Sequence, residues 1–200
     1  MKEISLWNKG KIVNYVLVDD EDFEWISSWK WFKCQSGYAR RKGLVNEGSR
    51  HRKHIYMHKE IMTKYFGSYE YTNKQFTDHK DNNRLNNQKS NLRICTPSQN
   101  AQNMKKQARK LTSSYKGVVR TSNGNWQCTI SKDSTHIYTG TFSTEIEAAI
   151  KYNLLAKEHF EEFAKLNHIP DEYNNIVPME NRKKCSSIYR GVQISPLIAK

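Results

Sequence analysis

The segment from Phe76 to Cys95 constrains the fold of this chain most strongly, because two short β-prone runs flank a loop rich in Asn. Phe76-Thr77 leads into Asp78-His79, and Asn91-Leu92-Arg93-Ile94-Cys95 has the composition of a second strand. Between them, Asp81-Asn82-Asn83 is a turn-forming run. We therefore expect a pair of strands joined by a polar loop.

A helix is expected to follow this strand pair directly. Thr96 can serve as the N-cap, Pro97 suits the first helical position, and Gln99 completes a capping box three residues after the cap. Asn100 then lies in the first helical turn. An apolar stripe predicts that the helix continues toward residue 111, and its members are Ala101, Met104, Ala108 and Leu111.

The charge of the chain indicates the kind of partner it binds. In 200 residues, 33 Lys and Arg stand against 20 Asp and Glu, a formal net charge of +13. Because each phosphate neutralised by Lys or Arg releases condensed counterions, such a charge favours a polyanionic partner. A His/Asp/Asn cluster on a phosphate-binding protein in turn suggests phosphodiester cleavage.

Cysteine usage and hydropathy indicate a soluble intracellular protein. The four cysteines lie far apart without a Cys-x-x-Cys pair, so neither a zinc knuckle nor a disulfide framework is expected. The segment starting at Met1 has no apolar signal core, and no stretch approaches the roughly 18 apolar residues of a membrane span. We expect a cytoplasmic protein that is not secreted, acts without a membrane or a small-molecule cofactor, and is a monomer.

Five residues of the strand–loop–strand–helix unit have the chemistry for hydrolysis. A neutral His79 can take the proton of an attacking water, while Asp78 and Asn100 offer hard oxygen ligands for one Mg²⁺ or Mn²⁺. Adjacent strand residues point to opposite faces, so Asp78 and His79 are expected at the end of a strand. Asn91 is expected to fix the loop and orient His79. Arg93 is expected to hold a phosphate, with a surface salt bridge as the alternative.

The segment before this unit reads as a mixed module. Val13, Tyr15 and Leu17 have strand period, and the Asp19-Asp20 pair can cap a short helix that carries Phe23, Ile26 and Trp29. Strands over 31–34 and 38–41 flank a turn, and a helix over 55–65 follows a basic run. We place an α/β module at 1–54 and the catalytic core with a basic helical linker at 55–111.

The remaining chain predicts a second domain at 112–168. Strands are expected over 115–120, 126–130 and 136–142, and Asn123-Gly124 joins the first two as a hairpin. Thr144 and Glu147 form the capping box of a helix whose apolar face consists of Ile146, Ala149, Asn153, Ala156, Phe160 and Phe163. In the tail, 169–200, the run Tyr189–Val192 partly repeats Tyr115–Val118. The predicted fold class is α+β throughout.

The joint spacing of Asp78-His79, Asn91-Leu92-Arg93 and Thr96 through Asn100 resembles the HNH nucleases, in particular phage and intron-encoded homing endonucleases. The resemblance covers roughly residues 11 to 105 and implies a ββα-metal core in which Asp78 and Asn100 bind the metal and His79 activates water. Asn rather than a second His on the helix implies one weakly held ion. His58 is a further candidate for a direct role, and packing at the start of its helix is the alternative explanation.

The second domain resembles the AP2/ERF DNA-binding domain over 113–167, on the residues Tyr115–Val118, Trp126, Gly140–Phe142 and Glu147–Ala149. That family places a three-stranded sheet in the major groove, backed by a helix. Val119 and Ser131 replace arginines that read guanine in plant members, so a GC-rich preference does not carry over. Trp126 is expected in the core.

Together these features predict a site-specific homing endonuclease that cuts or nicks double-stranded DNA. The alternatives are a DNA-binding regulator with an inactive nuclease core and a restriction-type nuclease. RNA is disfavoured because its A-form major groove is deep and narrow. The predicted DNA contacts are basic or polar, and they are Arg40, Arg41, Arg52, Lys53, Lys105, Lys106, Arg109, Lys110, Lys116, Arg120, Asn125, Gln127, Thr129, Lys132, His136 and Tyr138.

Overall fold

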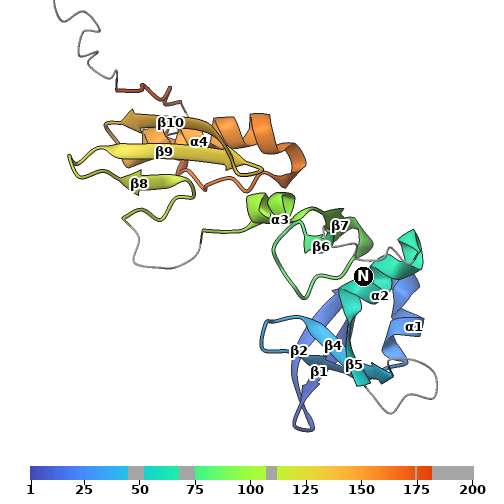
Figure 1. The fold of residues 1–200 in the computed structure, drawn as a ribbon. Helices are drawn as coiled ribbons and strands as arrows, with labels where there is room; N and C mark the ends of the chain where they lie inside the picture. Colours follow the sequence, from blue (N-terminus) through green and yellow to red (C-terminus); the bar gives the residue numbers. More distant parts are fainter. Residues whose placement is uncertain (45–51, 68–74, 107–111, 174, 182–200) are drawn as a thin grey trace, which may run out of the picture.

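A five-stranded sheet forms the N-terminal part of the computed structural model, which describes residues 1–44, 52–67, 75–106, 112–173 and 175–181 (Figure 1). Its strand order is β2-β1-β3-β4-β5, and only β1 and β3 are parallel. The strands are β1 (Lys2–Asn8), β2 (Lys11–Val18), β3 (Trp31–Lys33), β4 (Ala39–Leu44) and β5 (Arg52–Tyr56). Helix α1 (Asp20–Ser27) connects β2 to β3, and α2 (Met57–Phe66) follows β5.

The first core joins this sheet to the nuclease unit. Its buried members come from β1, β2, α1, β3, β4 and α2, and also from Leu92 in β7. The boundary expected after residue 54 therefore falls inside β5, and residues on both sides of it share one core. The strand expected from the period of Val13, Tyr15 and Leu17 is present as β2, and its buried side chains are Val16 and Val18, whereas Val13 and Tyr15 are exposed. Pairing of Ile4 with Val16 sets this register.

The expected strand–loop–strand–helix unit is present. β6 (Phe76–His79) and β7 (Leu92–Cys95) pair antiparallel, a 3₁₀ turn over Lys89–Asn91 precedes β7, and α3 (Pro97–Asn103) follows it. Both hydrogen bonds of the Thr96–Gln99 capping box are formed, each from a backbone N–H to the other residue's side-chain oxygen.

Helix α3 is shorter than the apolar stripe predicted. It ends at Asn103, and Met104 is extended and exposed. Ala101 is also exposed, and residues 108 and 111 lie outside the described residues. The end is set by tertiary contacts, because the Lys116 Nζ of the following domain donates to the carbonyls of Ala101, Gln102 and Met104 at 3.2, 2.5 and 2.8 Å.

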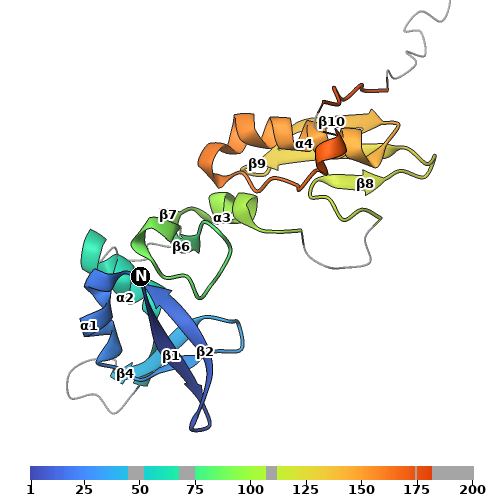
Figure 2. The same cartoon turned by 180° about the vertical axis from the view of Figure 1, so that it is seen from behind.

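The second domain is a three-stranded antiparallel sheet of order β10-β9-β8 packed on one helix, seen from behind in Figure 2. Its elements are β8 (Val118–Arg120), β9 (Trp126–Lys132), β10 (Thr135–Phe142), α4 (Glu145–Phe160) and two short 3₁₀ helices, Glu161–Phe163 and Asp171–Tyr173. The Thr144–Glu147 capping box is formed, and Trp126 packs against the core as expected. Strand β8 starts later than predicted.

The buried face of α4 differs in part from the prediction. Ala149, Ala156 and Phe160 are buried as predicted, and Tyr152 is also buried although it was not predicted on this face. Gly117 makes this possible, because its φ is +73° and a Cβ there would lie 2.1 Å from the Tyr152 ring. The predicted face residue Asn153 instead exchanges two hydrogen bonds with the backbone of Asn167. The partial repeat at Tyr189–Val192 lies outside the described residues.

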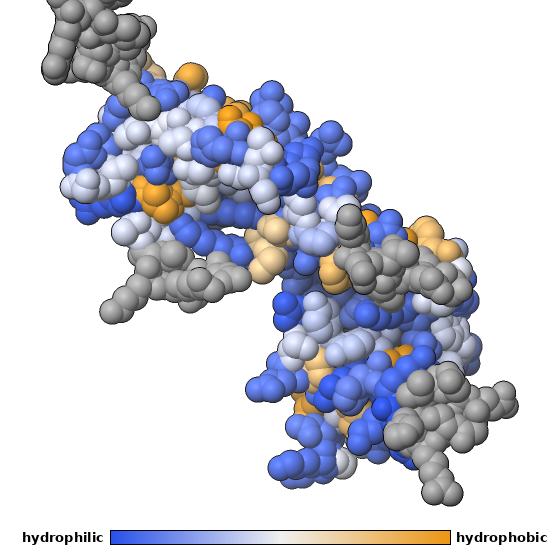
Figure 3. Space-filling view, in the orientation of Figure 1, coloured by the Kyte–Doolittle hydropathy of each residue, from blue (hydrophilic) through white to orange (hydrophobic). Residues whose placement is uncertain are grey.

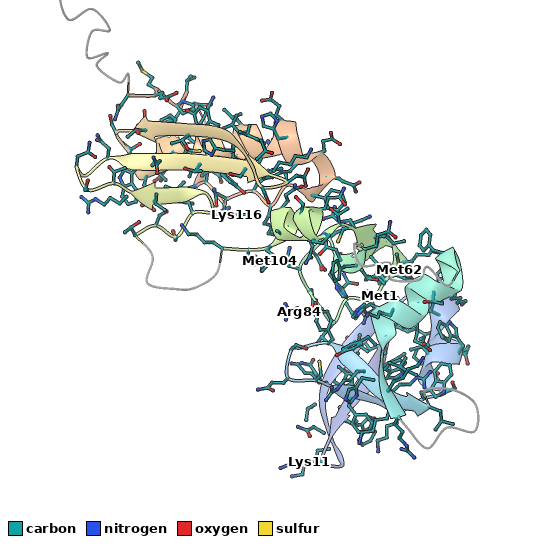
Figure 4. The ribbon with its side chains drawn as sticks, viewed as in Figure 1. Met1, Lys11, Met62, Arg84, Met104 and Lys116 are labelled. Atoms are coloured by element: carbon teal, nitrogen blue, oxygen red, sulfur yellow. The ribbon has the colours of Figure 1, made fainter. Side chains whose placement is uncertain are left out.

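Helix α3 lies between the two halves of the molecule in both views (Figures 1 and 2). Lys116 and Met104 meet at its end, where both are labelled in Figure 4. Among the described helices, none combines the length and apolar character needed to cross a membrane.

Candidate active site

A cleft of about 700 Å³ is formed where β6, the start of α2, and α3 with the residues that follow it come together. Three of the predicted catalytic and metal-binding residues line it, Asp78, His79 and Asn100, and so do two predicted DNA contacts, Lys105 and Lys106. His79 is the last residue of β6, which allows it and the adjacent Asp78 to border the same space. Arg84, labelled in Figure 4, lines this cleft as well.

His79 is held by an amide that the sequence did not single out. Its Nε2 lies 3.0 Å from Asn87 Oδ1, and Asn87 Nδ2 in turn faces the Met57 sulfur at 3.6 Å. With the amide in this orientation, Nε2 carries the proton and Nδ1 is the basic nitrogen. Burial lowers the pKa of His79 below its usual value, partly offset by the Asn87 hydrogen bond, so the ring is neutral at pH 7.

Asp78 is buried beside an arginine and an asparagine. Arg93 donates from Nε and Nη2 to Asp78 Oδ2 at 3.0 and 2.9 Å. Asn103 Nδ2 lies 3.1 and 2.9 Å from the two carboxylate oxygens and 2.9 Å from the His79 carbonyl oxygen. A single amide therefore ties α3 to both residues at the end of β6.

The contacts of Arg93 differ from those expected. Its side chain is only 9% exposed, its Nη1 donates to the Glu162 carbonyl at 2.7 Å, and its guanidinium stacks on Phe163 at 3.8 Å. A buried guanidinium engaged in this way does not suit a phosphate clamp. The alternative of a surface salt bridge is met in part, because Arg93 Nη1 also lies 3.5 Å from Oε2 of the exposed Glu162. Arg93 instead neutralises Asp78 and links the nuclease unit to the second domain.

Asn91 closes the loop between the two strands. Its Nδ2 donates to Asp81 Oδ1 at 3.0 Å and to the Asn86 carbonyl at 2.8 Å, and its Oδ1 accepts from the Asp81 backbone N–H at 3.1 Å. These contacts match the expected fixing of the loop. The side-chain hydrogen bond that orients His79 comes from Asn87 and not from Asn91.

The donor set of the cleft suits a hard divalent cation. Asp78 Oδ1 accepts hydrogen bonds only from Asn103 among the described residues, which leaves it a lone pair. The Asn100 side chain lines the same cleft and makes no hydrogen bond to the described residues. A carboxylate and an amide oxygen are ligands that Mg²⁺ and Mn²⁺ accept, with water and phosphate oxygens completing the shell.

Several predicted DNA contacts are engaged within the protein. Lys116 binds the end of α3, and burial lowers the pKa of Lys116 to about 8. Lys106 donates to two backbone carbonyls at 2.6 and 2.8 Å, and Lys132 donates to the His159 carbonyl at 2.9 Å. These contacts correct the assignment of Lys116 and Lys106 to a DNA-contacting surface.

Two further predictions change for similar reasons. Tyr138 pairs with the buried Ile130, so it lies on the α4 side of the sheet rather than the outer side, and its hydroxyl donates to Glu180 at 2.8 Å. Arg41 forms an ion pair with Glu60 at 3.0 Å.

The other predicted contacts remain exposed or half-buried at the surface, and they are Arg40, Arg52, Lys53, Lys105, Arg120, Asn125, Gln127, Thr129 and His136. Arg109 and Lys110 lie outside the described residues. Thr129 and His136 both contact Thr139, which places them together on the outer face of the second sheet.

The N-terminal module carries a second concave surface, of about 560 Å³. Arg40, Arg41 and Arg52 line it together with further basic side chains and the aromatic residues Trp7, Trp29 and Phe32, and none of the described residues that border it is acidic. The face of the molecule in Figure 3 is mostly hydrophilic, with small separated apolar patches.

Comparison with known proteins agrees with this geometry. The model of an HNH endonuclease family matches residues 56–102, which span α2, the strand pair and most of α3. An uncharacterized HNH endonuclease of Acanthamoeba polyphaga mimivirus is 32% identical over 165 residues, covering 82% of this chain and 80% of that protein. No solved structure matches the chain.

The chain therefore belongs to the HNH endonuclease family. This membership supports a nuclease that acts on DNA, and nucleases of this family generally use a divalent metal. The family match ends at residue 102, so the AP2-like character of the second domain stays a prediction.

Proposed function

We propose that this protein is a metal-dependent endonuclease that hydrolyses phosphodiester bonds of duplex DNA, with His79 as the general base and Asp78 and Asn100 as ligands of one Mg²⁺ or Mn²⁺. The observation that carries the proposal is that these three side chains line one cleft, with His79 oriented by Asn87. Their chemistry is complementary, because one group accepts a proton while two offer oxygen ligands.

In the proposed reaction, His79 Nδ1 accepts a proton from water while the water oxygen forms a bond to phosphorus and the P–O3′ bond breaks. The Nε2–H···Oδ1 bond to Asn87 keeps the ring in this tautomer and stabilises the imidazolium that forms. A neutral ring at pH 7 is ready for this role. When bound, the divalent ion supplies neutralisation of charge on the phosphate and on the leaving oxygen.

Two further surfaces support binding of a long duplex. The basic surface that includes Arg40 and Arg52 offers cations for the DNA backbone on the N-terminal side. On the other side, the outer face of the second sheet presents Gln127, Thr129 and other polar side chains, which suits an AP2-like reader. Cutting and recognition would then be separate tasks.

A homing role in a mobile element and action as a monomer complete the proposal. The modular layout supports this role, since a backbone-cutting core carries little sequence information and needs a separate reader. Cleavage of an intron-lacking target gene, compared with unrelated DNA of equal length, tests it. Equal cutting of both DNAs would favour a restriction-type or structure-selective enzyme.

Plasmid nicking tests the nuclease proposal itself. Supercoiled plasmid incubated with the protein and Mg²⁺ should be converted to the relaxed form, and a chelator should stop the conversion. Asp78→Ala should lose the Mg²⁺-dependent activity. Arg52→Ala, at an exposed position, should cut at the wild-type rate when the protein is saturating. Plasmid that stays supercoiled with wild-type protein while DNA binding persists would identify a DNA-binding protein without cutting activity.

A further inference from the structure

A second histidine, His58, borders the same cleft from the opposite element. It is the second residue of α2, it is 6% exposed, and it lines the cleft together with His79. The two imidazole rings stand edge to face with centroids 5.3 Å apart. His58 therefore lies within the candidate active site rather than beneath it.

The surroundings of His58 are aromatic, and within the part of the chain that the structure describes no residue forms a hydrogen bond with its side chain. Its ring packs against Tyr38 and Tyr56, with centroids 4.9 and 5.7 Å away, in addition to His79. Its Nδ1 is buried and lacks a hydrogen-bond partner among the described residues. This leaves Nε2 as the nitrogen available to a group in the cleft.

Packing alone does not account for an imidazole at this position. A buried polar group without a partner is destabilising by about 1–3 kcal/mol, a penalty that a phenyl or alkyl side chain would avoid. The aromatic neighbours Tyr38 and Tyr56 would accommodate a phenyl ring equally well. The Nδ1 penalty persists when a ligand binds at Nε2, so a function of the Nε2–H group toward a ligand would explain why histidine is kept at this position despite that penalty.

The charges around the cleft favour an anionic ligand. Lys59, Arg84 and Lys105 line it, and the carboxylate of Asp78 is matched by Arg93. Burial, with lesser effects from His79 and Lys59, lowers the pKa of His58 to about 3, so at pH 7 the ring is neutral and carries one N–H. A neutral donor stands beside His79 without competing for the proton of the attacking water.

We propose that His58 is a further catalytic residue, whose Nε2–H donates a hydrogen bond to a non-bridging oxygen of the scissile phosphate. This inference rests on the proposed nuclease function and adds a phosphate-binding group to it. His58 exchanges no proton in the reaction. Its contribution is a fixed dipole directed at charge that grows on the phosphate oxygens in the transition state.

Two substitutions separate this role from packing. His58→Phe keeps the ring but removes the donor, whereas His58→Gln keeps a donor but fills the aromatic site poorly. If His58 binds phosphate, His58→Phe lowers the single-turnover cutting rate on the order of 100-fold at unchanged DNA affinity and with a melting temperature no lower than that of the wild type, and His58→Gln retains more activity. If His58 only packs, this order reverses and His58→Phe cuts like the wild type, which would overturn the proposal.

His168→Phe is the matched control, because this histidine is exposed in the second domain and the substitution is the same. Should both His58 variants melt early, side-chain ¹⁵N NMR of the wild type replaces them. Duplex DNA added without divalent ions should shift the His58 nitrogen resonances, and an unchanged spectrum would reject the contact. Failure of the wild type to cut would overturn the nuclease proposal as well, whereas equal cutting by wild type and His58→Phe would overturn only this one.

Discussion

Arg93→Ala should destabilise the N-terminal half of the protein strongly. Arg93 and Asp78 are 9% and 8% exposed in their side chains, and they are joined by two hydrogen bonds of 2.9 and 3.0 Å. The substitution leaves the carboxylate buried with Asn103 as its remaining donor. It also removes the stack on Phe163 and the bond to the Glu162 carbonyl.

The size of the effect follows from these contacts. Removing one partner of a buried ion pair typically costs about 3–5 kcal/mol, because the other charge is left uncompensated. Loss of the cation–π stack adds about 0.5–1 kcal/mol, and the bonds from Asn103 to Asp78 reduce the total somewhat. We expect a loss of about 3–4 kcal/mol, a large fraction of the roughly 5–15 kcal/mol that stabilises a typical domain.

Urea unfolding followed by tryptophan fluorescence measures this loss. Four of the five tryptophans lie before residue 32, so the signal reports mainly on the N-terminal half. Exposed Arg52→Ala is the matched control and should stay within about 0.5 kcal/mol of the wild type. Adding Asp78→Asn to Arg93→Ala should restore about 1–3 kcal/mol, because it removes the uncompensated charge. A loss below about 1 kcal/mol for Arg93→Ala would refute the reasoning.

Two further predictions concern acid stability and the contact between the domains. The pKa of His58 is about 3 in the folded protein and about 6.5 in the unfolded chain, so the unfolded chain binds more protons between these values. The free energy of unfolding should therefore fall by about 2 kcal/mol from pH 7 to pH 5 because of His58. In urea titrations at the two pH values, His58→Phe should lack this contribution. The same pH dependence of stability in the wild type and in His58→Phe would contradict the prediction. Lys116→Met removes three hydrogen bonds to the end of α3, and hydrogen–deuterium exchange in α3 should become faster. Unchanged exchange there would show that Lys116 does not hold the helix end.

Elements that depend on local hydrogen bonds could be predicted from the sequence. The capping boxes at Thr96 and Thr144 require only residues within one helical turn, and both are formed. The end of α3 could not be predicted in this way. It depends on Lys116, a side chain of the next domain, and on Asn103 turning inward to Asp78 rather than continuing an apolar stripe.

The candidate site shows the same division between local pattern and tertiary contact. The spacing of Asp78, His79 and Asn100 sufficed to expect these residues in one place, and they line one cleft. The groups that hold them, Asn87 and Asn103, were missed. An Asn three residues after Asn100 on the same helix is a weak signal for Asn103, but only the folded chain brings its amide to β6.

His58 shows why the sequence could not decide between a direct role and packing for part of the site. Its segment reads as an ordinary amphipathic helix, and Met57, Ile61 and Met62 are buried on the same helix. Only the cross-chain packing against Tyr38 and His79 brings the ring into the cleft. About twenty residues of sequence separate His58 from Tyr38 and from His79, so no local pattern predicts the cluster.

The most direct test of the account is the rate of DNA cutting by His79→Ala at saturating protein, measured together with DNA affinity. His79 is the only proposed proton acceptor, so we expect cutting to fall on the order of 100- to 10,000-fold while the affinity for duplex DNA stays close to that of the wild type. Cutting at the wild-type rate by His79→Ala would contradict the central claim.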